Sequence, residues 1–187
     1  MKKEVVKKKQ CYKENEGKSH GALFSCPGSV ERKAGRPCAG KTGKNFLDVA
    51  RMVANAIEGV PAQRSGWYFN NAFTEPLSKK DNNRSEARNS KILSPINIAR
   101  LKKELAKVKV LWVFGEKAKQ VVEVLLNQGC LAGVKICYAR HLSMQSLNTG
   151  VKKDVLGNCI RKGQVGATSL RLAVIAKEIE NEMKNMD

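Results

Sequence analysis

The segment KVLWVFGEKAKQVVEVLLNQG (109–129) determines the fold class of this chain. Residues 109–115 predict a strand, because their apolar run is that expected of a strand buried on both faces. Residues 116–129 predict a helix, and Gly129 is the kind of residue that commonly terminates one. A buried strand that leads directly into a helix is the repeating unit of parallel α/β proteins.

The same alternation extends outward from this segment in both directions. Three further strands are expected, at 21–26, 67–73 and 134–140. Three further helices are expected, at 45–57, 95–108 and 169–185, the second capped by Ser94 and the third by Thr168. Loops are expected at 28–45, 75–90 and 141–167. The order predicts an α/β fold, a three-layer α/β/α arrangement with a mostly parallel four-stranded central sheet.

Length and composition indicate a single folded unit. The chain has 187 residues, of which 42% are apolar, so it has enough material for one compact core. Residues 1–19 are polar and charged and are expected to form a basic flexible arm, and residues 20–187 to form the domain. No run of 18 apolar residues and no signal-peptide pattern is found. We therefore expect a cytoplasmic monomer that does not enter a membrane.

The charge of the chain indicates a polyanionic partner. The net charge at pH 7 is +18, from 35 Lys and Arg against 17 Asp and Glu. Basic pairs also occur far from the N-terminal arm, at 79–80, 152–153 and 161–162. Cations placed on phosphates release condensed counterions, so DNA is the expected partner.

The six cysteines contain no CxxC pair. In a chain without a secretory signal they are expected to be reduced thiols. No metal ligand set and no cofactor are predicted.

Three segments are expected beyond the carboxyl ends of the strands, where parallel α/β sheets place their sites. These are SCPGSVE (25–31), NNAFTEP (70–76) and RHLSMQS (140–146).

One further motif has two functional interpretations. GRPCAGKT (35–42) fits the phosphate-binding pattern G-x-x-x-x-G-K-[ST] at every position. It does not follow a strand directly, which disfavours a nucleotide hydrolase but leaves it as an alternative. Backbone N–H groups and Lys41 could instead hold a DNA phosphate, or the loop could have no ligand.

Four blocks in order resemble uracil-DNA glycosylases of the bacterial thermostable type. They are Pro27–Gly28 with Glu31 and GRPCAGKTG (35–43), then YFNNAFTEP (68–76), LWVFGEKAKQVV (111–122) and RHLSMQS (140–146). The likeness covers residues 21 to 147 and implies the α/β fold already expected, together with DNA binding, base flipping and base excision.

The resemblance also implies catalytic roles. His141 would donate a hydrogen bond to the base O2, where negative charge develops as the base leaves. Asn70 aligns with the Asn that reads the edge of the base, and its amide can donate and accept. Glu31 is the nearest carboxylate to orient a water molecule. The expected activity is hydrolytic, by a monofunctional DNA glycosylase.

The base pocket departs from the family pattern. We assign six residues to it: Ser25, Cys26, Pro27, Gly28, Cys38 and Asn71. Ser25 replaces the usual acid, Cys26 stands where other branches have Asp or Asn, and Cys38 replaces a stacking Phe. Gly28 also lacks the side chain with which some branches block a C5 substituent. The two small residues Gly28 and Cys38 indicate a base larger than uracil, such as the hypermodified cytosine of phage DNA. The missing acid leaves a non-catalytic DNA-binding relative as an alternative.

Contacts to the DNA strand are expected from two groups of residues. They are Arg36, Lys41 and Lys44 in the first, and Ser143, Gln145, Ser146 and Leu147 in the second. Either Gln145 or Leu147 would act as the wedge that enters the vacated base stack. The cysteines of the thermostable type's iron–sulfur cluster are missing, so no cluster is expected. DNA repair and antiviral defence both fit this activity.

Overall fold

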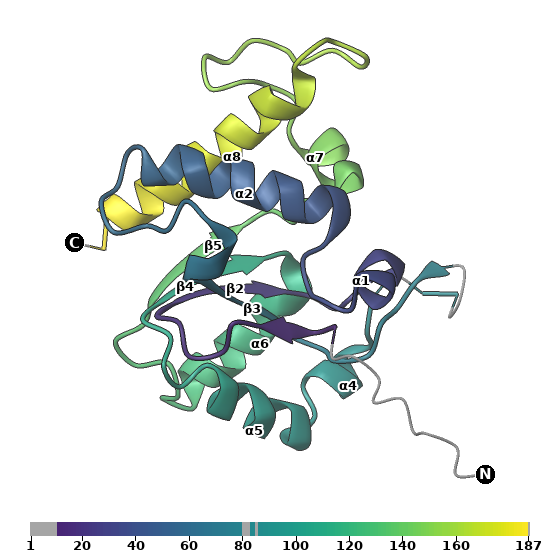
Figure 1. The fold of residues 1–187 in the computed structure, drawn as a ribbon, viewed down its shortest axis with the longest axis vertical. Helices are drawn as coiled ribbons and strands as arrows, with labels where there is room; N and C mark the ends of the chain where they lie inside the picture. Colours follow the sequence, from purple (N-terminus) through teal and green to yellow (C-terminus); the bar gives the residue numbers. More distant parts are fainter. Residues whose placement is uncertain (1–10, 80–82, 85, 187) are drawn as a thin grey trace.

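The computed structural model describes residues 11–79, 83–84 and 86–186. Its centre is a five-stranded sheet in the order β1-β3-β2-β4-β5. The four longer strands, which pair in parallel, are β2 (His20–Phe24), β3 (Trp67–Asn71), β4 (Val110–Phe114) and β5 (Lys135–Ala139). The α/β class and the mostly parallel sheet are thus confirmed (Figure 1).

The expected strand count of four is corrected by β1 (Lys13–Glu14), which pairs antiparallel with β3 at the sheet edge. This strand lies inside the segment expected to be a flexible arm, and Cys11 just before it is buried. The folded part therefore begins before residue 20. Two residues are too few to show a strand periodicity, so the sequence carried no signal for this element. Residues 1–10 of the arm lie outside the described residues.

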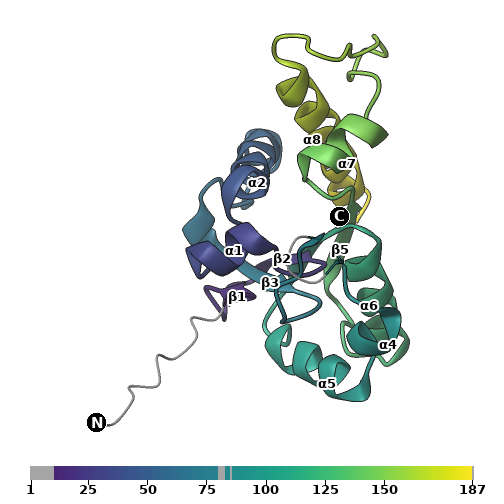
Figure 2. The same ribbon diagram turned by 90° about the vertical axis from the view of Figure 1, so that its right-hand side faces the viewer.

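Helices cover both faces of the sheet. One face packs against α2 (Gly40–Ala54) and α8 (Ala167–Lys184), and the other against α5 (Pro95–Glu104) and α6 (Glu116–Asn127). Figure 2 shows these two layers on opposite sides of the strands. The three-layer α/β/α arrangement follows because each strand side is apolar and must be buried.

Aromatic rings fill the core on the α2 side. Phe46 of α2 meets the rings of Phe69 and Trp67 edge-on, with centroids 4.9 and 5.0 Å apart. Phe24 stacks on Phe114 at 4.8 Å. This cluster packs α2 along the sheet, from Trp67 at the start of β3 to Phe24 and Phe114 at the ends of β2 and β4.

Several short helices occupy segments for which no helix was expected. They are α1 (Ser29–Ala34), α4 (Asn89–Ile92), α7 (Met144–Gly150) and the 3₁₀ turn η1 (Arg64–Gly66). Helix α1 buries no residue, and α7 buries only Leu147. Without an apolar stripe, such helices have no periodicity to detect. The expected cap at Thr168 is also wrong, because α8 already begins at Ala167, after Gly166.

Along the described ranges, no helix combines the length and the apolar character needed to cross a bilayer.

Candidate functional site

A cleft of about 940 Å³ lies beyond the carboxyl ends of β2, β4 and β5. Helices α1 and α7 contribute to its walls. Two of the three expected site segments, those after β2 and β5, meet here, and the third contributes Asn71. From the expected base pocket and catalytic set the lining includes Ser25, Cys26, Gly28, Glu31, Cys38, Asn71 and His141. From the expected DNA contacts it includes Ser143, Gln145 and Ser146.

His141 has a defined tautomer in this cleft. The backbone N–H of Ser143 donates to Nδ1 of His141 across 3.1 Å, so in the neutral imidazole the proton resides on Nε2. Burial lowers the pKa of His141 below its ordinary value. The edge of the ring packs against Phe24, with centroids 5.9 Å apart. The side chain is thus a neutral hydrogen-bond donor of fixed orientation.

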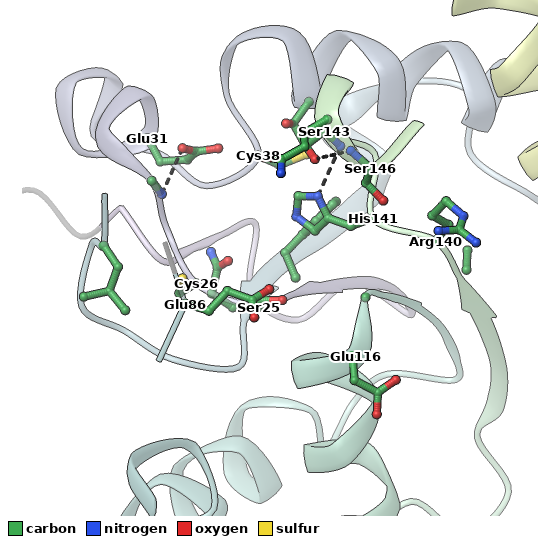
Figure 3. Close-up of a pocket in the computed structure, with 18 of the residues that line it drawn as sticks. Ser25, Cys26, Glu31, Cys38, Glu86, Glu116, Arg140, His141, Ser143 and Ser146 are labelled. Carbon is green, nitrogen blue, oxygen red and sulfur yellow. Dashed lines mark hydrogen bonds between the residues drawn. The ribbon is translucent and has the colours of Figure 1, made fainter. Parts of the chain in front are cut away.

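Gly115 allows His141 to approach the end of β2. Its φ of +89° is a conformation that favours glycine. A Cβ built there would lie 3.3 Å from Cβ of His141 and 3.6 Å from Oγ of Ser25. The histidine and the serine therefore flank one glycine, and Figure 3 shows His141 with Ser25 and Cys26 on one side and Ser143 and Ser146 on the other.

The two cleft cysteines are protonated thiols at neutral pH. Burial raises the pKa of Cys26 to about 11, with the nearby charge of Glu86 adding to the effect. Burial also raises the pKa of Cys38, which is 3% exposed. A thiol is a poor nucleophile compared with its thiolate, so neither cysteine is activated for nucleophilic attack, and both line the cleft.

The assignment of Asn70 to the base is wrong. Its side chain is fully buried on the opposite side of β3, where Nδ2 donates to Oη of Tyr68 at 2.8 Å and to Oε2 of Glu104 at 3.1 Å. Side chains alternate between the faces of a strand, so a shift of one residue exchanges the faces. Asn71, not Asn70, reaches the cleft.

The amide of Asn71 has a fixed orientation. Its Nδ2 donates to the backbone carbonyl of Tyr12 at 3.2 Å, and Arg100 donates to the backbone carbonyl of Asn71 at 3.1 Å. Among the described residues no partner bonds Oδ1, so the acceptor end of the amide is the one available to a ligand. Residues just before β1 thus help to set the polarity of the cleft.

Glu31 lines the cleft but also caps a helix. Its Oε2 accepts the backbone N–H of Gly28, the N-cap residue of α1, at 3.0 Å (Figure 3). Pro27 is buried, and its carbonyl accepts the N–H of Leu77. One carboxylate oxygen of Glu31 is therefore committed to local structure.

Three further carboxylates in the lining were not expected from the sequence: Glu86, Glu116 and Glu178. The charge of Glu86 helps to raise the pKa of Cys26, and both residues line the cleft (Figure 3). It comes from the segment 75–90, which carries no motif. Across the described part of the chain, no three His, Cys, Asp or Glu side chains gather as metal ligands.

The expected phosphate-binding residues lie outside the cleft but next to it. Arg36 and Lys44 line a smaller hollow of about 290 Å³, together with Arg51. Cys38 forms part of the wall of both hollows. Lys41 is exposed in the first turn of α2, whose N-terminus has no side-chain cap. Free N–H groups and cations at a helix N-terminus favour an anion.

The second group of expected DNA contacts lies on α7 and its N-cap, and its members differ in their exposure. Ser143 caps the helix by accepting the N–H of Ser146, and Gln145 is exposed at its first turn. Leu147 is fully buried in the core, so its expected role as a wedge is wrong. Only Gln145 of the two wedge candidates remains accessible.

The GRPCAGKT motif lacks the context of a nucleotide-binding loop. It follows helix α1 rather than a strand, and Gly35 ends that helix with a φ of +64°. Lys41 and Thr42 start α2. The loop therefore does not have the strand–loop–helix arrangement that wraps a nucleotide.

No protein-family model matches this chain, and no curated protein is significantly similar to it.

Proposed function

We propose that this protein is a hydrolytic DNA glycosylase that flips a pyrimidine nucleotide into the cleft and removes its base. The observation that carries the proposal is His141: a neutral donor, held in one tautomer by the N–H of Ser143, at the carboxyl edge of a parallel sheet. The resemblance of the sequence blocks to uracil-DNA glycosylases supports the same assignment.

The chemistry needs a donor where charge develops. When the bond between the base N1 and the sugar C1′ breaks, its electron pair stays on the base and spreads to O2. The Nε2–H of His141 is suited to stabilise that oxygen, because a preorganised donor in a buried site loses little energy in reorienting. Asn71 would bind the edge of the base through Oδ1.

A water molecule then attacks C1′ of the sugar cation and transfers a proton to a carboxylate. Two carboxylates of the cleft are suited to this, Glu31 and Glu86. Since one oxygen of Glu31 already accepts the N–H of Gly28, Glu86 is the better placed of the two.

Charge supports a DNA substrate. The hollow that contains Arg36, Lys44 and Arg51 shares the wall at Cys38 with the cleft. A strand whose flipped base occupies the cleft would place its flanking phosphates near these cations. The net charge of +18 would add attraction over longer distances.

The size of the cleft favours a base with a substituent at C5. Its volume of about 940 Å³ lies at the upper end of the range of about 300–1,000 Å³ that is usual for ligand pockets. Gly28 and Cys38, both small, stand along it. The proposed substrate is a C5-modified pyrimidine such as a hypermodified cytosine, and the proposed setting is a cytoplasmic monomer in repair or antiviral defence.

The test is a base-release screen. The purified protein is incubated with duplexes that carry uracil, thymine, 5-hydroxymethylcytosine or its glucosylated form, and free base is measured by mass spectrometry. We expect release from a C5-substituted duplex, loss of release in His141→Ala, and near-normal release in His20→Ala, which changes the only other histidine, outside the cleft.

Three outcomes have distinct meanings. Release of uracil alone would remove the enlarged-pocket proposal but keep the glycosylase. DNA binding without release of any base would indicate the non-catalytic relative. ATP hydrolysis that Lys41→Ala abolishes would support the nucleotide hydrolase instead.

A further inference from the structure

The segment that joins α7 to α8 contains an ordered hairpin, residues 152–160. Lys153 and Cys159 form an antiparallel bridge, and the N–H of Ile160 donates to the carbonyl of Lys152 at 2.8 Å. In both ribbon views this segment projects beyond α7 and α8 (Figures 1 and 2). We call it the 152–160 hairpin.

Asp154 organises the tip of the hairpin. Its Oδ1 accepts the N–H groups of Leu156 and Asn158, at 2.9 and 2.8 Å. Gly157 completes the turn with a φ of +85°. Although desolvation opposes it, hydrogen bonds from Asn158, Leu156 and Gly157 lower the pKa of Asp154. The tip therefore has a defined conformation.

The base of the hairpin is held by the core. Val151 and Ile160 are buried, and the buried guanidinium of Arg171 on α8 donates to the carbonyl of Val151 at 3.0 Å. A tip with internal hydrogen bonds on a buried base is presented at a fixed position relative to α7 and α8.

The tip exposes apolar side chains between cations. Leu156 is 83% exposed and its neighbour Val155 is 55% exposed. Exposed cations accompany this tip: Lys152 and Lys153 in the hairpin, and Arg161 and Lys162 directly after it. With the one acid, Asp154, residues 152–162 have a net charge of +3. A single exposed apolar residue needs no explanation, but an ordered apolar tip within a cationic segment fits a groove lined by phosphates.

The hairpin lies one short helix away from the cleft. Helix α7 begins beside the cleft, which Gln145 and Ser146 line, and ends at Gly150 where the hairpin segment starts. Seven helical residues span about 10 Å. A duplex with one nucleotide in the cleft extends farther than this, so the same duplex can reach the hairpin.

We propose that the 152–160 hairpin is a second DNA-binding element, which inserts Leu156 and Val155 into a groove of the duplex beside the flipped nucleotide. Arg161 and Lys162 contact the phosphates that border the groove. Apolar side chains that enter a minor groove unstack neighbouring base pairs and help to kink the duplex. This inference rests on the proposed DNA substrate.

The apolar contact is tested with Leu156→Ala. We expect about tenfold weaker binding of a duplex and loss of the fluorescence increase that 2-aminopurine shows when it is unstacked next to the target base. The matched control is Ile96→Ala, an 86% exposed residue on α5, which should bind and unstack like the wild type. Equal behaviour of both variants would overturn the insertion of the tip.

The phosphate contacts are tested with the double variant Arg161→Ala and Lys162→Ala. The slope of log affinity against log salt concentration should fall by about 0.9 for each phosphate contact that is lost. Lys102→Ala with Lys103→Ala, another adjacent and exposed basic pair, is the control and should keep a slope closer to that of the wild type. An unchanged slope in the hairpin variant would refute these contacts.

The results separate this inference from the proposed function. Reduced duplex binding in the hairpin variants supports the hairpin even if no base is released from any substrate. If both hairpin variants bind the duplex and release the base as the wild type does, the hairpin does not bind DNA. The proposed glycosylase activity is then unaffected. Loss of binding to vesicles of anionic lipid, with duplex binding unchanged, would overturn the assignment to DNA.

Discussion

The backbone N–H of Ser143 donates to Nδ1 of His141 at 3.1 Å. This bond requires an unprotonated Nδ1, so it selects the neutral imidazole with its proton on Nε2. Ser143, the N-cap residue of α7, therefore also fixes the tautomer of His141.

The first prediction concerns pH. Burial lowers the pKa of His141 and of His20 in the folded state, whereas histidine in an unfolded chain has a pKa of about 6.5. The free energy of unfolding is therefore unaffected by these two histidines above that pH. It decreases as the pH falls below that value, because the unfolded state then binds more protons than the folded state.

Urea unfolding between pH 8 and pH 5 measures this effect. His141→Asn should show a smaller loss of unfolding free energy on acidification than the wild type. An identical pH dependence in the two proteins would mean that His141 is not held neutral by the fold.

The second prediction compares Asn70 with Asn71. Asn71→Ala should lower the rate of base release about 10- to 100-fold, because a hydrogen bond to the base is lost. Asn70→Ala should instead lower the unfolding free energy by about 1–3 kcal/mol, because Glu104 and Tyr68 lose a buried partner. Single-turnover kinetics on folded protein and urea unfolding measure the two effects. The reverse pattern would restore the assignment made from the sequence.

The third prediction identifies the residue that orients the water. Glu86→Gln should slow base release about 100-fold, which is at the lower end of the contribution of general bases. Glu31→Gln should have an effect of less than about tenfold, because Glu31 also caps α1 and the amide retains an acceptor for the cap. Equal and near-normal rates in both variants would remove the carboxylates from the mechanism.

The fourth prediction concerns pocket size. Gly28 has a φ of −96°, which other residues adopt freely, and an added Cβ would meet only the carboxylate end of Glu31, at 3.0 Å. Gly28→Leu should therefore fold and should reduce the release of bulky C5-substituted bases more than the release of unsubstituted ones. Competition between the two duplexes in one tube gives the ratio of substituted to unsubstituted base released. An unchanged ratio would mean that the C5 substituent does not lie next to Gly28.

The fifth prediction concerns the core. Phe46 is fully buried among five aromatic rings, so Phe46→Ala should lower the unfolding free energy by about 3–5 kcal/mol. Ile96→Ala, at an exposed position of α5, should change it by less than about 0.5 kcal/mol. Chemical denaturation of both variants checks the contrast, and a small effect at Phe46 would contradict the packing of α2 described above.

The sequence by itself determined the fold class and the edge of the sheet where the cleft lies. Buried strands show as continuous apolar runs, and the surface helices show as apolar residues at helical spacing. Both signals are local, so the strand predicted at 109–115 and the helix predicted at 116–129 were identified without any knowledge of their partners. The carboxyl ends of parallel strands share one edge, and this places the segments around Ser25 and His141 together.

Only the tertiary structure decided which side chains reach the cleft. Asn70 and Asn71 are adjacent and identical in type, and the pairing of β3 between β1 and β2 determines which one faces the core network around Glu104. Leu147 and Gln145 lie in one short helix, and packing against the core buries the first and leaves the second exposed. Glu86 lies in a segment without a periodic pattern and enters the cleft only through long-range packing. Which face a residue presents depends on contacts between elements distant in the chain, and a local pattern carries no record of them.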